Sequence, residues 1–166
     1  MCIKKILITF AIALPGFYSG LQAQDSAQVP IVGFSYVDSL MQQKSDTTIL
    51  INFWATWCAP CVHELPHFDS LLTKYAGQKL KVVLVSMDFK RNYQSALLPF
   101  LEKNKIQSPV VLMYEPGAGE WITTVDSTWS GAIPATLIFN RGKRQFLEKE
   151  LSEQELHNLV DSFIKP

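Results

Sequence analysis

Hydrophobic positions along the chain follow two spacings, and each spacing predicts one kind of secondary structure. Short continuous apolar runs rich in β-branched residues are typical of strands buried on both faces. Such runs occupy three stretches of the sequence, 48–54, 80–87 and 109–114. A fourth run at 133–139 is followed by turn residues at 140–143 and a return strand at 144–149, which predicts a hairpin.

Apolar residues spaced three and four apart predict the helices, because these positions share one helical face. The first stripe precedes all the strands and consists of Phe34, Val37, Leu40 and Met41. A second helix is expected over residues 59–76, kinked by Pro66 and ended by Gly77. A third is expected over residues 92–103, with an interruption near Pro99.

The C-terminal third of the chain completes the pattern. Residues 115–131 show no clear period and are predicted to form a loop with a short helix. Ser152 and Glu155 have the capping-box spacing that opens a last helix, whose core-facing residues are Leu156, Leu159, Val160 and Phe163. Because strands alternate with helices until a final hairpin and helix, we expect an α/β fold with a central mixed β-sheet flanked by helices on both faces.

The N-terminus, residues 1–24, is predicted to be a secretory signal peptide. Lys4 and Lys5 supply the positive charge, the apolar run extends over 6–14, and Leu21-Gln22-Ala23 or Gln22-Ala23-Gln24 offers a cleavage site. The alternative is an uncleaved anchor, but the apolar run is shorter than the roughly 20 residues that a membrane span requires. Residues 25–46 are then a lead-in, with a linker to about 32 and a helix, and residues 47–166 form the single main domain.

Charge and cysteine content narrow the function. Removing Lys4 and Lys5 leaves 13 basic against 15 acidic residues, a formal charge of −2, so neither nucleic acid nor anionic lipid is an expected partner. Cys2 would leave with the signal peptide, and the mature chain would keep Cys58 and Cys61. One intramolecular pair in an oxidising compartment is typical of a working disulfide, and no cofactor is expected.

The candidate chemistry lies at Cys58-Ala59-Pro60-Cys61, where the strand at 48–54 passes into the helix at 59–76. Unpaired backbone N–H groups and the positive end of the helix dipole favour the thiolate there. Two cysteines three residues apart on one turn predict a redox switch. Half a zinc site and a purely structural disulfide are the alternatives, whereas haem attachment would need histidine where Val62 stands.

A resemblance sharpens this interpretation. The run Phe53-Trp54-Ala55-Thr56-Trp57-Cys58-Ala59-Pro60-Cys61 resembles the active site of the thioredoxin superfamily. The continuation Cys61-Val62-His63-Glu64-Leu65-Pro66 is similar to the TlpA/ResA-type branch of extracytoplasmic thiol–disulfide oxidoreductases. The resemblance covers about residues 47–164 and implies a thioredoxin-like fold. It also implies that Cys58 attacks a partner disulfide and that Cys61 resolves the mixed disulfide.

The resemblance also implies roles for residues outside the dithiol. In the family the position of Pro134 is a cis-proline beside the cysteines, so the Ile133 backbone would pair with an extended substrate. Trp57 and Pro60 would border that substrate. Glu64, one helical turn after Cys61, is either the acceptor of its proton or a solvated helix residue. Asn52 stands where thioredoxin itself has a buried acid, so that acid's role is absent or displaced.

The expected function is therefore that of an exported reductant of protein disulfides, in the periplasm or otherwise outside the cytoplasm. Cytochrome c maturation and general disulfide reduction are the two substrate classes that the resemblance implies. The neutral pair Ala59-Pro60 adds nothing that would stabilise the Cys58 thiolate further, which favours a reductant. The expected partners are a protein disulfide and an upstream electron-donor protein, and a monomer without a membrane span is expected after cleavage.

Two alternatives stay open at the level of sequence. One is a metal-binding or metallochaperone module that uses Cys58, Cys61 and either His63 or His67. The two histidines share one helix face, which favours surface positions over metal ligation. The other is a non-catalytic binding domain with a fixed disulfide. The lead-in before residue 47 lacks an obvious hairpin, unlike the family branch, so the specific substrate stays open.

Overall fold

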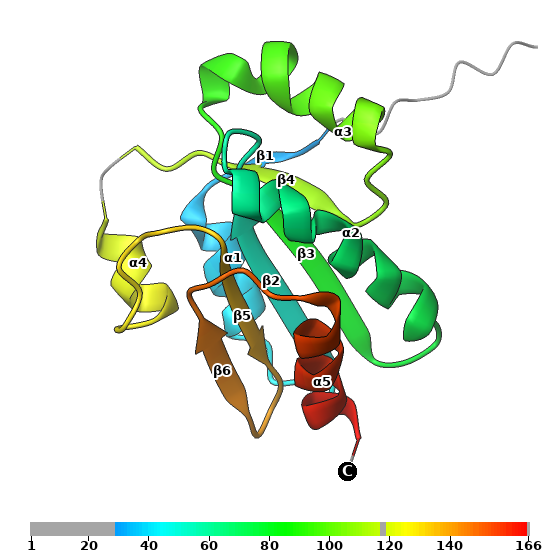
Figure 1. Cartoon of the computed structure of the whole chain (residues 1–166). Coiled ribbons are helices and arrows are strands. Elements are labelled where there is room, and N and C mark those ends of the chain that lie inside the picture. Colours follow the sequence, from blue (N-terminus) through cyan, green and yellow to red (C-terminus); the bar gives the residue numbers. More distant parts are fainter. Residues whose placement is uncertain (1–28, 117–118, 166) are drawn as a thin grey trace, which may run out of the picture.

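A computed structural model describes residues 29–116 and 119–165, which form one six-stranded mixed sheet covered by helices (Figure 1). The strand order is β1-β4-β3-β2-β5-β6. The strands are β1 (Ile31–Val32), β2 (Thr48–Trp54), β3 (Leu80–Ser86), β4 (Val110–Met113), β5 (Ala135–Phe139) and β6 (Arg144–Leu147). The first four in this order run parallel, β5 runs antiparallel to β2, and β6 runs antiparallel to β5. The predicted signal peptide lies outside the described residues.

Strand β2 lies in the middle of the sheet, and its side chains are mostly apolar. All seven residues of β2 are buried. It pairs in parallel with β3 and antiparallel with β5, so Asn52 lies opposite Leu84 on one side and Thr136 on the other. A strand whose residues are apolar on both faces is stable only when both faces are covered.

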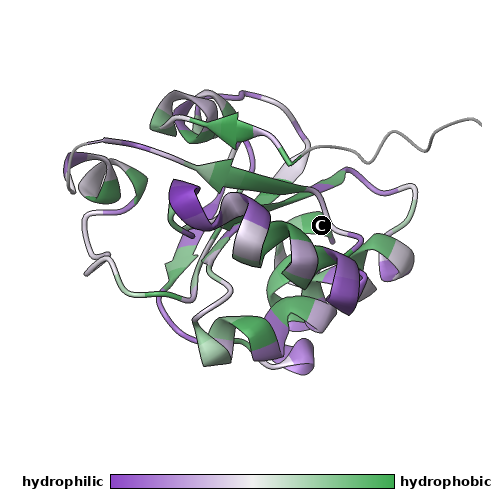
Figure 2. Cartoon of the chain, turned by 90° about the horizontal axis from the view of Figure 1, so that it is seen from above, coloured by the Kyte–Doolittle hydropathy of each residue, from purple (hydrophilic) through white to green (hydrophobic). Residues whose placement is uncertain are grey.

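Helices cover both faces, as the sequence predicts. They are α1 (Phe34–Met41), α2 (Ala59–Lys74), α3 (Leu98–Asn104), α4 (Glu120–Val125) and α5 (Glu153–Ile164). One core contains buried residues of α2 and α5, with partly buried residues of α3 packed against it. The other core contains Val37 and Leu40 of α1 and Val125 of α4. Figure 2 shows the largely hydrophobic strands between helices that carry both hydrophilic and hydrophobic residues.

The edge of the sheet differs from the prediction. Residues 31–32, predicted as part of a linker, form the short strand β1. The backbone N–H groups of Leu112 and Tyr114 in and after β4 donate to the carbonyls of Pro30 and Val32, each at 2.8 Å. Without β1 this edge of β4 would expose a row of unpaired backbone groups, so the two-residue strand satisfies them.

The helix predicted at 92–103 is also wrong in its first half. A 3₁₀ turn at Lys90–Asn92 and a π-helical turn at Tyr93–Leu97 precede α3, which begins at Leu98. Pro99 lies in the first turn of α3, directly after the π-helical turn, where proline is tolerated better than in a helix interior. The interruption that the sequence predicts near Pro99 is thus a change of helix type.

The remaining helix boundaries follow the predictions closely. Helix α2 ends at Lys74 rather than Ala76, and Gly77 takes a φ of 77° in the turn that follows. Ser152 and Glu155 form the predicted capping box at the start of α5. The predicted short helix between 115 and 131 is α4. Over the described ranges, 29–116 and 119–165, no helix combines the length and apolar character that crossing a membrane requires.

Candidate active site

The dithiol lies where β2 passes into α2. Cys58 is the N-cap residue of α2, and its sulfur accepts a hydrogen bond from the Cys61 backbone N–H at 3.3 Å. Pro60 lies in the first turn, where proline is favoured because its position needs no N–H donor. Cys58 and Cys61 form a disulfide. The structure thus places the pair at the helix start, as the sequence predicts.

The two sulfur-bearing residues differ in exposure. Cys58 is 6% exposed, whereas Cys61 is fully buried beneath it in the core on the α2 side of the sheet. Trp57 and Pro60, the predicted substrate-binding residues beside the dithiol, are both exposed. Trp54, three residues before Trp57, is fully buried and packs against Phe100 with ring centroids 5.5 Å apart.

The Ile133–Pro134 segment meets the dithiol from the other side. Its peptide bond is cis, and the Ile133 carbonyl oxygen lies 3.6 Å from the Cys58 sulfur. Pro134 is buried, and β5 begins directly after it. Two segments 75 residues apart in sequence are therefore brought together at the carboxyl end of β2. The backbone of residue 133 and the sulfur of residue 58 border the same surface.

Glu64 is fully buried, so its alternative interpretation as a solvated helix residue is wrong. Its Oε1 accepts from the Asn52 side-chain amide at 2.7 Å, and its Oε2 accepts from the Leu151 backbone N–H at 2.8 Å. Burial raises the pKa of Glu64 to about 7, an effect that these two hydrogen bonds oppose and that the nearby charge of Glu150 strengthens. A carboxyl group that titrates near neutrality thus lies one helical turn after Cys61.

Asn52 and Thr136 complete this polar cluster inside the sheet. The Asn52 amide also donates to Thr136 Oγ1 at 3.1 Å, across the β2–β5 pair. Both residues are fully buried. Asn52 stands where thioredoxin itself has a buried acid, and here the buried carboxylate of the cluster belongs to Glu64 on α2, which Asn52 holds from β2.

Asp88 is a site residue that sequence reasoning missed. It lies two residues after β3, is almost fully buried, and accepts from Thr56 N at 3.1 Å and Thr56 Oγ1 at 2.6 Å. Ser86 Oγ donates to the same carboxylate at 2.8 Å. These bonds hold the turn before Cys58 against the end of β3. The signal that could have revealed it is an acidic residue directly after a continuous apolar strand.

The histidines do not gather around the cysteines. His63 is exposed and pairs with Glu150, and His67 lies half-buried beside it with ring centroids 6.2 Å apart. His157, on α5, hydrogen-bonds Ser70 Oγ at 3.1 Å. Among residues 29–116 and 119–165, no group of three or more His, Cys, Asp and Glu side chains is arranged to hold a metal ion.

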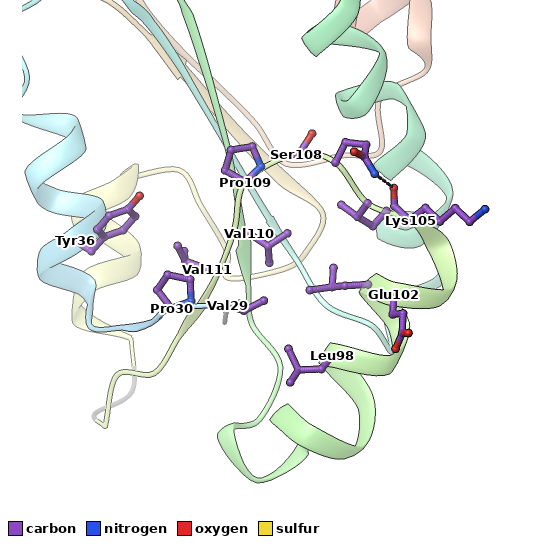
Figure 3. A pocket seen from close by; sticks show the side chains of 13 residues that line it. Val29, Pro30, Tyr36, Leu98, Glu102, Lys105, Ser108, Pro109, Val110 and Val111 are labelled. Carbon is purple, nitrogen blue, oxygen red and sulfur yellow. Dashed lines mark hydrogen bonds between the residues drawn. The ribbon is translucent and has the colours of Figure 1, made fainter. Parts of the chain in front are cut away.

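A separate hollow of about 1000 Å³ opens between α3 and the β1–β4 edge of the sheet. Figure 3 shows Val29, Leu98 and Val110 around it, with Glu102 and Lys105 at its rim. Neither cysteine nor Glu64, Ile133 or Pro134 lines this hollow. The dithiol site therefore lies at the carboxyl end of β2 and is distinct from this hollow.

Known proteins are similar to this chain in sequence. Residues 34–144 match the AhpC/TSA family. The sporulation thiol-disulfide oxidoreductase A of Bacillus subtilis is 32% identical over 119 residues, which are 66% of this chain and 72% of the relative. The thiol-disulfide oxidoreductase ResA of Bacillus cereus is 26% identical over 112 residues, which are 67% of this chain and 58% of that relative.

Solved structures agree in fold. A thioredoxin-related protein from Neisseria meningitidis serogroup B has a TM-score of 0.62 at 24% identity and covers 75% of this chain and 89% of its own. A secreted thiol-disulfide isomerase from Corynebacterium glutamicum has a TM-score of 0.60 at 18% identity and covers 74% and 73%. The chain therefore belongs to the thioredoxin-like AhpC/TSA family and carries, in Cys58–Cys61, the disulfide of a thiol–disulfide oxidoreductase.

Proposed function

We propose that this oxidoreductase is exported and reduces disulfides of partner proteins. The observation that carries the proposal is the difference in burial within the dithiol: Cys58 reaches the surface at the N-cap of α2, and Cys61 lies directly inside it. Thiol–disulfide exchange requires one thiol that the partner protein can reach and a second thiol, shielded from the partner, that lies next to the first.

The reaction proceeds in two exchanges that conserve electrons. The Cys58 thiolate attacks one sulfur of the partner disulfide, which forms a mixed disulfide and releases the other partner sulfur as a thiolate. Cys61 then attacks the Cys58 sulfur, which closes the Cys58–Cys61 disulfide and releases the second partner sulfur. The dithiol loses two electrons and the partner gains them. An upstream electron-donor protein returns Cys58–Cys61 to the dithiol by the same exchanges.

Glu64 serves the second exchange in this proposal. Cys61 is fully buried, and burial in apolar surroundings raises the pKa of a thiol. The Glu64 carboxylate, with its pKa at about 7, accepts the Cys61 proton and passes it to the departing partner sulfur. Each Glu64 oxygen keeps a lone pair beyond the bonds from Asn52 and Leu151.

The partner segment lies between Trp57–Pro60 and the Ile133 backbone. The exposed ring of Trp57 and the exposed Pro60 border Cys58 on the helix side, and the Ile133 carbonyl lies 3.6 Å from its sulfur on the other. An extended substrate strand that pairs with backbone groups at residue 133 would hold its disulfide over Cys58.

The direction of electron flow follows from the residues between the cysteines. Ala59 and Pro60 carry no charge or side-chain donor, so the Cys58 thiolate gains stabilisation only from the helix terminus. A weakly stabilised thiolate makes the dithiol a better electron donor. We therefore expect a reduction potential nearer the roughly −270 mV of thioredoxin than the roughly −120 mV of DsbA. Equilibration with glutathione redox buffers measures it.

Location and substrate class extend the proposal. Among similar structures is one described as secreted, and residues 1–24 carry the signal-peptide pattern, which together support export to the periplasm or another extracytoplasmic space. Cytochrome c maturation and general disulfide reduction are the two candidate pathways. N-terminal sequencing of the exported protein tests this, and we expect residues 1–24 to be absent.

The test of the proposed function is a mixed-disulfide trap. The full chain carrying Cys2→Ser and Cys61→Ser keeps Cys58 as its one thiol and cannot resolve a mixed disulfide. Expressed in its native cells, this variant should accumulate adducts that dissociate on reduction and that mass spectrometry identifies. The matched control, the full chain carrying Cys2→Ser and Cys58→Ser, keeps the fully buried Cys61 as its one thiol and should trap almost nothing. Equal adducts in both chains would rule out the assigned nucleophile.

A further inference from the structure

Three exposed aromatic side chains follow the ends of three neighbouring strands. Trp57, Phe89 and Tyr114 come shortly after β2, β3 and β4, and are 60%, 56% and 46% exposed. These strands are adjacent and parallel, so their carboxyl ends meet at one edge of the sheet. We call these three residues the aromatic ledge. Exposed apolar side chains that gather on one part of a surface, rather than singly, are typical of interaction sites.

Contacts between neighbouring residues link the segments that carry the ledge. Thr56, next to Trp57, donates two hydrogen bonds to Asp88, which precedes Phe89. Lys90, which follows Phe89, lies with its Nζ 4.8 Å from the centre of the Tyr114 ring. These contacts hold the segments that carry Trp57, Phe89 and Tyr114 next to one another, beginning one residue before Cys58.

Two cations belong to the same surface. Lys90 stacks on Tyr114, and Arg91 lies with its guanidinium carbon 4.7 Å from the centre of the Phe89 ring. Both cations are exposed, and within the described part of the chain neither pairs with a carboxylate. The acidic residues beside them are engaged elsewhere: Asp88 is buried under Thr56 and Ser86, and Glu115 accepts the Phe34 backbone N–H at 2.8 Å.

We propose that the aromatic ledge, with Lys90 and Arg91, receives an extended partner segment that carries acidic and apolar side chains next to its disulfide. The inference rests on the proposed function and adds the kind of substrate that it prefers. Three adjacent strand ends span about 10 Å, the length of about three extended residues. Tyr, Trp and Arg are the side chains that contribute most at protein interfaces. The two unpaired cations complement acidic side chains.

The test measures how fast Cys58 attacks two matched peptides. The protein is the reduced full chain with Cys2→Ser and Cys61→Ser, which has Cys58 as its one thiol. Each peptide has one cysteine activated as a 2-pyridyl disulfide, flanked by one phenylalanine and by either three aspartates or three lysines. Every rate is divided by the rate of the same protein with uncharged 2,2′-dithiodipyridine, which corrects for changes in the thiolate itself.

At low salt the acidic peptide should react about tenfold faster than the basic one, and 0.5 M salt should remove most of the difference. Replacing both cations, Lys90→Gln with Arg91→Gln, should lower the acidic-to-basic ratio at least about threefold. The matched control, Lys81→Gln with Lys103→Gln, removes two exposed cations at the start of β3 and in the last turn of α3 and should keep the ratio. A ratio near one in the parent, or an equal fall in both double variants, would overturn the proposal.

A second pair of variants tests the apolar part. Phe89→Ser should slow both peptides about threefold or more relative to dithiodipyridine, as loss of an aromatic contact predicts. Leu72→Ser, at an exposed position on α2, should not. Equal rates for Phe89→Ser and Leu72→Ser would overturn the aromatic contribution. A dimer of the parent chain that Phe89→Ser dissociates, seen by sedimentation, would assign the ledge to a second copy and overturn the peptide site.

The outcomes separate this inference from the proposed function. If Cys58 reacts with neither the peptides nor dithiodipyridine, the oxidoreductase function fails and the ledge loses its role with it. If Cys58 reacts readily but without preference between the peptides, the function stands and the ledge is excluded as the substrate-selecting surface.

Discussion

The two sulfurs of the dithiol have different surroundings although they lie three residues apart. Cys58 has the unpaired N–H groups of the first turn of α2 around it, whereas Cys61 lies fully inside the core. A helix N-terminus lowers the pKa of a thiol, and apolar burial raises it. The same helical turn therefore sets the roles of both residues.

This difference predicts which cysteine is alkylated first. In the reduced Cys2→Ser chain at pH 7, iodoacetamide should label Cys58 before Cys61, with a Cys58 pKa below about 8.5. Peptide mapping by mass spectrometry gives the site, and the rate against pH gives the pKa. In a Cys2→Ser, Cys58→Ser control, Cys61 should react slowly. Labelling of Cys61 ahead of Cys58 would reverse the assignment.

Glu64 gives a second prediction at the residue scale. Glu64→Gln keeps the size of the side chain but removes the group that accepts the Cys61 proton, so release of a bound peptide from the mixed disulfide should slow about 10²-fold. Alkylation of Cys58 should change little. Stopped-flow release kinetics from pH 6 to 8 give the measurement, because the parent rate should rise through the Glu64 pKa at about 7 and the variant rate should not.

The matched control for this experiment is Glu102→Gln. Glu102 is an exposed acid on α3 and lies away from the dithiol. Release at the parent rate is expected for it. If Glu64→Gln also releases peptide at the parent rate across the pH range, Glu64 has no part in resolving the mixed disulfide.

At the scale of elements, the end of β2 is held to the end of β3 by one carboxylate. Asp88 accepts both the backbone N–H and the hydroxyl of Thr56, and Met87 N donates to Trp54 O at 2.7 Å. The turn that carries Trp57 and leads into Cys58 thus has fixed partners on a neighbouring strand. A buried carboxylate of this kind is strongly destabilising when its donors are removed.

The chain contains its own control for this tether. Thr56→Val removes one donor to the buried Asp88 and should lower the free energy of unfolding by about 2 kcal/mol. Thr128 makes the same pair of bonds to Asp126, at 3.0 and 2.6 Å, but in an exposed turn. Thr128→Val should therefore lower the free energy of unfolding by less than about 1 kcal/mol. Urea unfolding of the oxidised proteins measures both, and equal losses would contradict the role given to burial.

At the scale of the whole molecule, stability depends on pH through Glu64. Its pKa rises from 4.5 in the unfolded chain to about 7 in the fold, chiefly through burial. Between these values the unfolded chain has lost the proton and the folded chain still binds it. Stability therefore falls as pH rises from about 4.5 to 7, by a total of about 3 kcal/mol, and then levels off.

Urea unfolding of the oxidised parent and of Glu64→Gln at pH 5, 6, 7 and 8 checks this. The difference in unfolding free energy between the two proteins should change by about 2.5 kcal/mol between pH 5 and pH 8 and favour the variant at higher pH. The acids whose pKa is lowered, among them Glu155 and Asp161, change their contribution at lower pH. A difference that stays constant with pH would show that Glu64 is ionised throughout.

Much of the fold and half of the site could be predicted because their signals are local. Continuous apolar runs predict β2 and β3, and the three-and-four spacing predicts α1, α2 and α5. The junction of β2 and α2 predicts Cys58 at a helix start, and the Ser152–Glu155 spacing predicts the cap of α5. In each case neighbouring residues along the chain satisfy one another, so their order is sufficient evidence.

The tertiary structure decided what depends on distant partners. Strand β1 forms by pairing with the edge strand β4. Residues 93–97 form a π-helical turn that the spacing of their apolar residues does not predict. The buried carboxylate of Glu64 bonds to the Asn52 amide and to the Leu151 N–H. These partners lie 12 and 87 residues away in sequence, so only the fold brings them to Glu64. Spacing along the sequence determines which face a residue occupies. Only the packing of the sheet against its helices determines which polar groups that face meets, and hence the Glu64 pKa, the Asp88 tether and the contact between Cys58 and Ile133.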